Sequence, residues 1–222
     1  DSDGWADSED DQPTNSLIWF DDDADGFGSN VGALPLDDCP QTAGNSTENL
    51  SGCPDSDGDG WADQEDAFPN EETQWRDSDA DGYGDEVDGL NPDHCRFDAG
   101  TSSHDRNGCV DSDMDGYSDP DIEWATLQGA DAFPNEETQW SDLDGDGFGD
   151  NSFPAYQGDV CPNKFGASNK NQVFGCPDKD GDGWWDDEDV CPSGKNTCWA
   201  AIISGEAPPT AKGIDLLIGL SG

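Results

Sequence analysis

The sequence predicts a mostly irregular repeat solenoid with little helix or strand, and three observations support this fold class. Only 31% of the residues are hydrophobic, and Asp plus Glu number 53 against 8 Lys plus Arg, so the formal net charge is −45. An acidic loop of the form D-x-D-x-D-G-aromatic recurs seven times. The eight cysteines fall in close pairs. A chain with this composition cannot bury an ordinary apolar core, so its order has to come from the repeats.

The composition also indicates what holds the chain together. Low hydrophobicity with high net charge is typical of disordered chains. Yet the sequence contains nine Trp, nine Phe and three Tyr, which a solvating acidic tail would not contain. Two carboxylates about 4 Å apart repel by about 1 kcal/mol in water and about 4 kcal/mol at an effective dielectric of 20. Clustered Asp residues are therefore tolerable where a cation lies among them.

The acidic loops repeat with a period of 56 residues, so that Asp21 recurs at Asp77 and Asp55 recurs at Asp111. The segment DAFPNEETQW at 66–75 returns unchanged at 131–140, and the third unit is longer because 120–129 is an insertion. The predicted domains are repeat unit 1 at 1–54 with a truncated first loop, repeat unit 2 at 55–110, repeat unit 3 at 111–177, a half unit at 178–199 and a tail at 200–222.

The ligand positions are clearest in the loop at 55–66, DSDGDGWADQED. Asp stands at positions 1, 3, 5, 9 and 12, Gly at position 6, and an aromatic residue at position 7, which would contribute its backbone carbonyl. We number the loops 1 to 7 along the chain, with position 1 of loops 2 to 7 at Asp21, Asp55, Asp77, Asp111, Asp142 and Asp178. The candidates at position 3 are Asp1, Asp23, Asp57, Asp79, Asp113, Asp144 and Asp180. Those at position 5 are Asp3, Asp25, Asp59, Asp81, Asp115, Asp146 and Asp182. Those at position 7 are Trp5, Phe27, Trp61, Tyr83, Tyr117, Phe148 and Trp184.

The remaining candidate ligands follow position 7. Those at position 9 are Asp7, Asp63, Asp85, Asp119, Asp150 and Asp186. A D-x-C-P motif or one of its relatives, such as the forms with Phe in place of Cys or Arg96 in place of Pro, then identifies a distal carboxylate for each loop. The distal candidates are Asp10, Asp37, Asp66, Asp93, Asp131, Asp159 and Asp189.

This ligand set favours calcium. Calcium prefers six to eight oxygen ligands, whereas zinc prefers nitrogen and sulfur, and the sequence offers only His94 and His104 as imidazoles. An EF-hand is not indicated, because the loops lack flanking helices and position 12 is Asp. The sequence therefore predicts a calcium-cored solenoid.

The cysteines predict local disulfides. No C-x-x-C knuckle is present, which argues against the competing zinc interpretation, and an even number of cysteines in close pairs fits an oxidising, extracellular compartment. Sequence spacing alone does not establish connectivity. Pairing between neighbours would give Cys39–Cys53, Cys95–Cys109, Cys161–Cys176 and Cys191–Cys198.

The pattern D-x-D-x-D-G-x-x-D-x-x-D-x-C-P resembles the thrombospondin type 3 repeat, in particular the long-spaced variants of prokaryotic surface proteins. The resemblance covers nearly all of 1–198. It implies a chain wrapped around a line of calcium ions, often two per motif, with disulfides linking adjacent turns, and so roughly seven to fourteen ions in this chain. Two departures are the aromatic residue at position 7, where the family has an aliphatic one, and the inserted segments after position 9 in four loops.

The functional prediction is a calcium-rigidified extracellular rod at the cell surface, either the subunit of a surface fibre or filament or the stalk of an adhesin, linked to itself or to other surface domains. The alternative is a carbohydrate- or protein-binding module, although Trp19, Trp75 and Trp140 are expected to pack between loops. We find no nucleophile elbow or phosphate loop, so an enzyme is not predicted. The negative charge disfavours nucleic acid, and no apolar stretch approaches the roughly 18 residues of a membrane span.

Two further features are assigned by sequence. Asn45-Ser46-Thr47 and Asn49-Leu50-Ser51 are glycosylation sequons within the Cys39–Cys53 segment, which makes Asn45 and Asn49 candidate acceptors. The segment NEETQW within each copy of the decapeptide is expected to form a capped, solvated helical turn. The apolar run at 214–220 is expected to be buried against the shaft or against the next subunit of a fibre. Position 1 of loop 1 would precede Asp1, so we expect either a longer array or a neighbouring molecule to complete that site.

Overall fold

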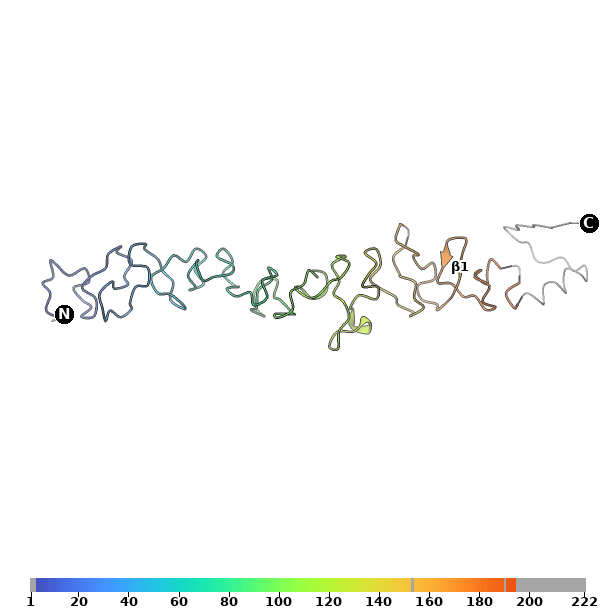
Figure 1. The fold of residues 1–222 in the computed structure, drawn as a ribbon, viewed down its shortest axis with the longest axis horizontal. Coiled ribbons are helices and arrows are strands. Elements are labelled where there is room, and N and C mark those ends of the chain that lie inside the picture. Colours follow the sequence, from blue (N-terminus) through green and yellow to red (C-terminus); the bar gives the residue numbers. More distant parts are fainter. Residues whose placement is uncertain (1–2, 153, 190, 195–222) are drawn as a thin grey trace, which may run out of the picture. The chain divides into compact units, whose positions relative to one another are not determined.

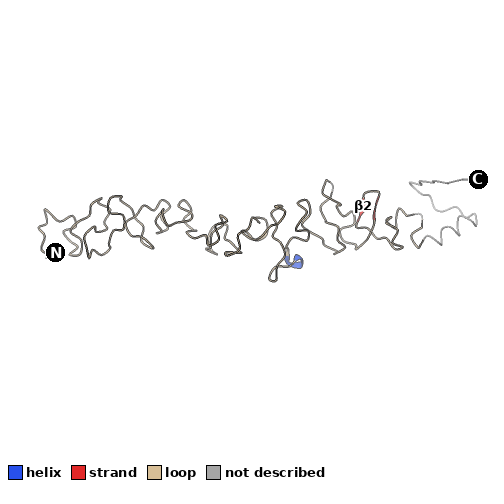
Figure 2. Ribbon diagram, in the orientation of Figure 1, coloured by secondary structure: helices blue, strands red, loops and turns tan. Residues whose placement is uncertain are grey.

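The computed structural model describes residues 3–152, 154–189 and 191–194, and nearly all of them lie in turns, bends and loops (Figure 2). The regular elements in these ranges are the 3-10 helix η1 at Thr126–Gln128 and the strands β1 at Asn169–Lys170 and β2 at Val173–Phe174. No helix within the described ranges is long and apolar enough to cross a membrane. The prediction of a mostly irregular fold is therefore confirmed.

Contacts divide the chain into two units, Asp1–Val110 and Asp111–Gly222. The described part of the first unit contains the isolated parallel bridges Gly28–Leu36 and Gly84–Pro92. In the second unit β1 and β2 form a short antiparallel hairpin, with Asn169 opposite Phe174 and Lys170 opposite Val173 (Figure 1). The helix η1 lies in the inserted segment 120–129 and stands away from the neighbouring loops of its unit (Figures 1 and 2).

The acidic loops share one backbone geometry. The glycine at position 6 has a positive φ in every loop, from 91° at Gly147 to 109° at Gly4. Position 4 is also left-handed, but its φ of 65° at Ala24 and Ala80 lies closer to the region that other residues can reach. This difference explains why glycine recurs at position 6 while position 4 varies.

Among the described residues, more polar than apolar residues are buried. The buried apolar residues are Ile18, Ala33, Cys53, Ala62, Cys109, Ala130 and Cys176. The buried acidic residues are Asp10, Asp37, Asp66, Asp85, Asp93, Asp111, Asp131 and Asp159. Carboxylates are seldom buried unless something pairs with them, so this interior is unlike an ordinary hydrophobic core.

Three of the predicted disulfides are confirmed, namely Cys39–Cys53, Cys95–Cys109 and Cys161–Cys176. The predicted pair Cys191–Cys198 involves Cys198, which lies outside the described residues. We call each segment between paired cysteines a disulfide loop. The second cysteine of each disulfide is buried and donates its backbone N–H to a fully buried serine hydroxyl. The serine–cysteine pairs are Ser46–Cys53, Ser102–Cys109 and Ser168–Cys176.

The NEETQW segment differs from the predicted helical turn. It forms two successive turns, in which Glu71 N donates to Phe68 O and Gln74 N donates to Glu71 O. The Gln74 side chain is 1% exposed rather than solvated. Its Oε1 accepts Glu86 N at 2.9 Å, and its Nε2 donates to the carbonyls of Glu86 and Leu90. The buried amide thus pairs with the backbone groups of Glu86 and Leu90, in the segment that follows position 9 of loop 4. A helical turn here would lose these contacts.

Stacked aromatic pairs connect successive loops. Trp61 at position 7 of loop 3 stacks on Trp75, which precedes loop 4, with ring centroids 6.3 Å apart. Trp5 stacks on Trp19 in the same way at 6.4 Å. Such rings bury apolar area without requiring a continuous core. The packing role expected for these tryptophans is thus observed.

Candidate metal centres

Backbone N–H groups fix the carboxylates of each acidic loop. In loop 3, Asp55 Oδ1 accepts Gly58 N at 2.7 Å, and its Oδ2 accepts Gly60 N at 3.0 Å. Asp59 Oδ1 accepts Trp61 N at 2.7 Å. Loops 4, 5, 6 and 7 repeat this pattern at the same positions. The side chains at positions 1, 3 and 5 are therefore held facing one another.

These carboxylates converge closely enough to share an ion. In loops 2 to 6, the three carboxylates at positions 1, 3 and 5 each offer an oxygen within 4.8 Å of the others. The five groups begin at Asp21, Asp55, Asp77, Asp111 and Asp142. Like charges at such separations repel strongly once water is excluded. The clusters could hold metal ions.

A fourth carboxylate joins each of loops 2 to 7 from further along the chain. The Oδ1 of the distal Asp66 accepts Phe68 N at 2.7 Å, which leaves its Oδ2 for another partner. Burial raises the pKa of Asp66, and the nearby charges of Asp59 and Asp57 contribute to the rise, so this carboxylate lies near the loop 3 cluster. The equivalent residues Asp37, Asp93, Asp131, Asp159 and Asp189 show the same hydrogen bond. Loop 5 retains its distal residue despite the insertion.

Many of these oxygens are buried and accept no hydrogen bond within the described part of the chain. Both carboxylate oxygens of Asp23, Asp79 and Asp144 are buried in this way. Ten further aspartates each have one such oxygen. These residues are Asp21, Asp37, Asp57, Asp59, Asp66, Asp93, Asp113, Asp131, Asp159 and Asp180. All belong to the ligand set that the sequence predicts. Burying a carboxylate without a partner is strongly unfavourable, so the donor set fits a hard cation that binds oxygen.

The electrostatics of the metal-free loops agree with this geometry. Burial, together with the charges of Asp115, Asp113 and Asp119, raises the pKa of Asp131 to about 7. Burial and the charges of neighbouring carboxylates together raise the pKa of Asp93 and of Asp159 to about 6. A backbone N–H lowers the pKa of each of these groups without offsetting burial. The distal sites therefore favour either a proton or a cation.

The structure gives position 9 a different place from the other predicted ligands. Asp63 accepts Ser56 N through Oδ1 and Ser56 Oγ through Oδ2, both at 2.7 Å. Asp85 and Ser78 repeat the arrangement in loop 4, and Asp119 pairs with Ser112 in loop 5. These carboxylates hold the backbone and hydroxyl of position 2 and so brace the loop.

Position 7 leaves its carbonyl available. Within the described ranges, no backbone hydrogen bond ends on the carbonyl oxygens of Phe27, Trp61, Tyr83, Phe148 or Trp184. By contrast, the position 6 carbonyls of Gly60 and Gly183 each accept two backbone N–H groups. A carbonyl free of hydrogen bonds beside an acidic cluster is a suitable additional oxygen ligand.

Loop 1 is only partly described. Asp1 lies outside the described residues, while Asp3 Oδ1 accepts Trp5 N at 2.9 Å as in the other loops. The distal Asp10 is 7% exposed and accepts Gln12 N, whereas Asp7 is exposed. The described half of loop 1 therefore follows the common pattern.

Disulfide loops join consecutive acidic loops. The loop closed by Cys39–Cys53 donates Gly44 N to Asp25 Oδ2 of loop 2 at 2.8 Å. It also donates Thr47 N and Glu48 N to Gly60 O of loop 3 at 2.8 and 2.9 Å. In the second unit the Cys161–Cys176 loop connects loops 6 and 7 through the matching Gly166, Asn169 and Lys170 amides.

Residues outside the predicted ligand set also position the sites. Gly52, Gly108 and Gly175 precede the second cysteine of each disulfide, have positive φ, and lie against the distal residues Asp37, Asp93 and Asp159. Gln139 holds the segment after loop 6 as Gln74 holds that after loop 4. The unchanged return of the decapeptide was the sequence signal for these glutamines, since a solvated turn would not require it.

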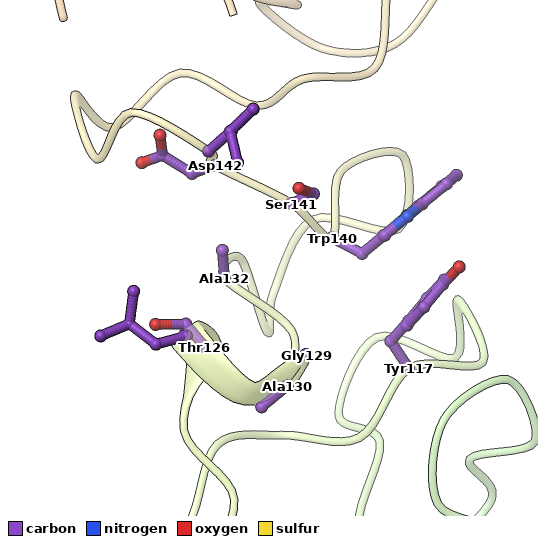
Figure 3. A pocket seen from close by; sticks show the side chains of 10 residues that line it. Tyr117, Thr126, Gly129, Ala130, Ala132, Trp140, Ser141 and Asp142 are labelled. Atoms are coloured by element: carbon purple, nitrogen blue, oxygen red, sulfur yellow. The ribbon is translucent and has the colours of Figure 1, made fainter. Parts of the chain in front are cut away.

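A cavity of ≈ 350 Å³ lies beside the aromatic pair of the second unit (Figure 3). Tyr117 and Trp140 stack at 5.1 Å on one side of it, and Thr126 of η1 lies on the opposite side. Leu127 of η1 also lines the cavity. The Leu127 side chain is fully exposed. The inserted segment thus creates a partly apolar hollow that the shorter loop 3 has no residues to form.

Comparison with protein-family models finds no match for this chain. Comparison with curated proteins finds no match either.

Proposed function

We propose that this chain is a calcium-binding extracellular structural protein, a rod stiffened by its ions that serves as a surface fibre or filament subunit or as an adhesin stalk. The observation that carries the proposal is the set of buried carboxylate oxygens without hydrogen-bond partners, which recurs at the same positions from loop to loop. The resemblance of the loops to thrombospondin type 3 repeats supports the same function. The three disulfides are typical of an oxidising compartment.

Calcium accounts for the donor set better than other common ions do. Each of loops 2 to 6 supplies three clustered carboxylates and a distal carboxylate, and loops 2, 3, 4 and 6 add the position 7 backbone carbonyl. Calcium accepts six to eight such oxygens in irregular arrangements, whereas magnesium demands near-ideal octahedral geometry and usually keeps several waters. Bound calcium would supply positive charge at each cluster, and the chain's own residues would orient the oxygens toward it.

Metal content is the direct test. The chain should be purified in calcium, passed through a metal-free column and analysed by elemental mass spectrometry. We expect about one or two calcium ions for each loop, or roughly seven to fourteen per chain. Magnesium in tenfold excess should not displace them. A folded chain that retains no calcium would contradict the proposal.

The structural role predicts self-association independently of ion binding. Electron microscopy of the purified chain in calcium should show filaments if it is a fibre subunit. Repeat arrays distribute their contacts between neighbours and so suit extended assemblies. A calcium-loaded chain that stays monomeric in sedimentation experiments would exclude the fibre and leave the stalk.

A binding module is the second candidate, and the cavity beside Tyr117 and Trp140 favours it specifically. Aromatic rings with adjacent polar groups are common in ligand sites, and the cavity is in the usual size range. Thr126 and Ser141 lie along its wall, and the Ser141 hydroxyl also donates to Asp150 Oδ2 (Figure 3). A carbohydrate is one ligand class that would use both features.

The repeated decapeptide provides a matched control for this second candidate. Trp140→Ala and Trp75→Ala each remove one stacked ring from the same local sequence. On a carbohydrate array, binding at the cavity should be abolished by Trp140→Ala and preserved by Trp75→Ala. Equal behaviour of the two variants, or no retention of the parent chain, would reject a carbohydrate site there.

A further inference from the structure

The disulfide loop Cys39–Cys53 contains two sequons, and the structure places their acceptor amides in opposite environments. The side chain of Asn45 is exposed, and the Thr47 side chain of the same sequon is exposed as well. Asn49 is half-buried, and its Nδ2 is entirely enclosed. Sequence alone treats these two asparagines as equivalent acceptors.

Asn49 is part of the framework. Its Oδ1 accepts Leu50 N at 2.7 Å and Ala62 N at 2.9 Å. Ala62 follows position 7 of loop 3 and is 0% exposed. The carboxamide therefore bridges the disulfide loop to a candidate metal loop. A sugar on the enclosed Nδ2 would have to displace this packing.

Asn45 is anchored through its backbone while its side chain stays accessible. Its N–H donates to Cys53 O at 3.1 Å. Its Nδ2 lies 3.5 Å from Asp55 Oδ2, at the limit of a hydrogen bond. Thr101 and Ala167 precede the buried serines of the other disulfide loops, as Asn45 precedes Ser46, and both are exposed. The fold accepts unrelated side chains here, so it does not itself require Asn45.

We propose that Asn45 is an N-glycosylation site of the secreted chain and that Asn49 is not. The donor would be an oligosaccharide linked to a lipid pyrophosphate. The Asn45 Nδ2 forms a bond to the anomeric carbon and loses one proton, and the lipid pyrophosphate leaves. The product keeps one N–H on Nδ2. A glycan added at Asn49 before folding would prevent the disulfide loop from closing against Ala62, so such chains would not be secreted in folded form.

Hydroxyl deletions separate the two sequons without altering either asparagine. Thr47→Ala disables the first sequon, and Ser51→Ala disables the second. The full chain should be secreted with calcium in the medium by a host that glycosylates a control protein, then examined by intact mass and glycopeptide mapping. We expect one glycan per chain at Asn45, complete loss in Thr47→Ala, and no change in Ser51→Ala.

Two results would overturn the assignment. One is a folded, secreted chain with a glycan on Asn49, and the other is an Asn45 that stays unmodified while the control protein is glycosylated. The inference rests on the proposed extracellular location, but calcium content measured on the same samples tests ion binding separately. Full calcium content with no glycan would remove the modification and leave the proposed calcium-binding role intact.

Discussion

Carboxylates of one residue type have two different roles in each acidic loop, and their hydrogen bonds distinguish them. Asp79 at position 3 of loop 4 has both oxygens buried without a partner in the described chain. Asp85 at position 9 instead holds the Ser78 backbone and hydroxyl. Asp79 could therefore contact a cation, whereas Asp85 keeps the loop closed.

Asp79→Asn should weaken calcium binding at loop 4 by about tenfold or more, which corresponds to about 1.4 kcal/mol. The change removes one charge and preserves shape. Ser78→Ala is the control, because it removes a hydrogen bond to Asp85 and leaves the cluster intact. Calorimetric titration of both variants measures the difference. Equal losses would show that position 3 has no special role.

The raised pKa values predict a pH dependence with a defined sign. In the metal-free folded state the pKa of Asp131 is raised from 3.8 to about 7. The contribution of Asp131 to the free energy of unfolding is therefore fully present below pH 3.8 and is lost as the pH rises toward 7. Asp93 and Asp159 lose theirs as the pH rises toward 6. Calcium requires the deprotonated groups, so its affinity should fall as the pH drops from 7 to 5.

Calorimetry in buffers of different ionisation enthalpy measures the protons released on calcium binding. Release should be larger at pH 6 than at pH 8, where these groups are already ionised. Asp131→Asn should reduce the release at pH 6. A proton count that does not change between the two pH values would contradict the predicted linkage.

At the scale of the element, the disulfide loop and the acidic loop form one structural unit. Gly52 has a φ of 74°, and a Cβ added there would lie 2.6 Å from Asp37 Oδ1. The distal carboxylate of loop 2 therefore packs directly on the turn that precedes Cys53. Any side chain at Gly52 has to displace either that turn or the carboxylate.

Gly52→Ala should destabilise the calcium-loaded chain by about 1–3 kcal/mol, as overpacking usually does. Gly58→Ala is the matched control, because Gly58 also has a positive φ, but a Cβ there meets nothing within 4 Å. Ala24 and Ala80 already occupy the equivalent position in loops 2 and 4. The effect of Gly58→Ala on the free energy of unfolding should therefore stay within about 1 kcal/mol. Thermal unfolding compares the two.

The repeated motifs allowed the sequence to predict the irregular fold and three disulfides, because those features depend on local spacing. The clusters at positions 1, 3 and 5 also follow from spacing, since Gly60 and its equivalents turn the chain within a few residues. The bracing role of Asp63 could not be predicted from the sequence. It depends on whether the Asp63 carboxylate lies closer to Ser56 or to the carboxylates at positions 1, 3 and 5. Gln74 was missed because its partners, Glu86 and Leu90, lie on a segment of irregular length.

At the scale of the whole chain, charge dominates the energetics. A formal charge of −45 would expand the chain, and the few buried apolar residues cannot oppose that repulsion. Specific binding of cations and general screening by salt are two different ways to reduce the repulsion between these carboxylates. Screening by 1 M salt reduces the Debye length to about 3 Å but places no cation among the buried oxygens.

Chelation should abolish the near-ultraviolet circular dichroism of the stacked pairs Trp5–Trp19 and Trp61–Trp75 while the disulfides remain intact. Calcium should restore the signal, and 1 M sodium chloride should restore little of it. Recovery in salt alone would mean that screening, rather than ligation, orders the chain. Persistence of the signal in chelator would exclude metal as the source of order.

The Cys39–Cys53 loop donates backbone amides to Asp25 on one side and to the Gly60 carbonyl on the other. Ordering of loop 2 therefore preorganises loop 3 in the same unit. Uptake of the first ion should raise the affinity for the next, so that half-saturated samples contain stretches of filled loops beside stretches of empty ones. A chain secreted into a medium rich in calcium would then become rigid progressively, with order spreading from the first filled loop to its neighbours.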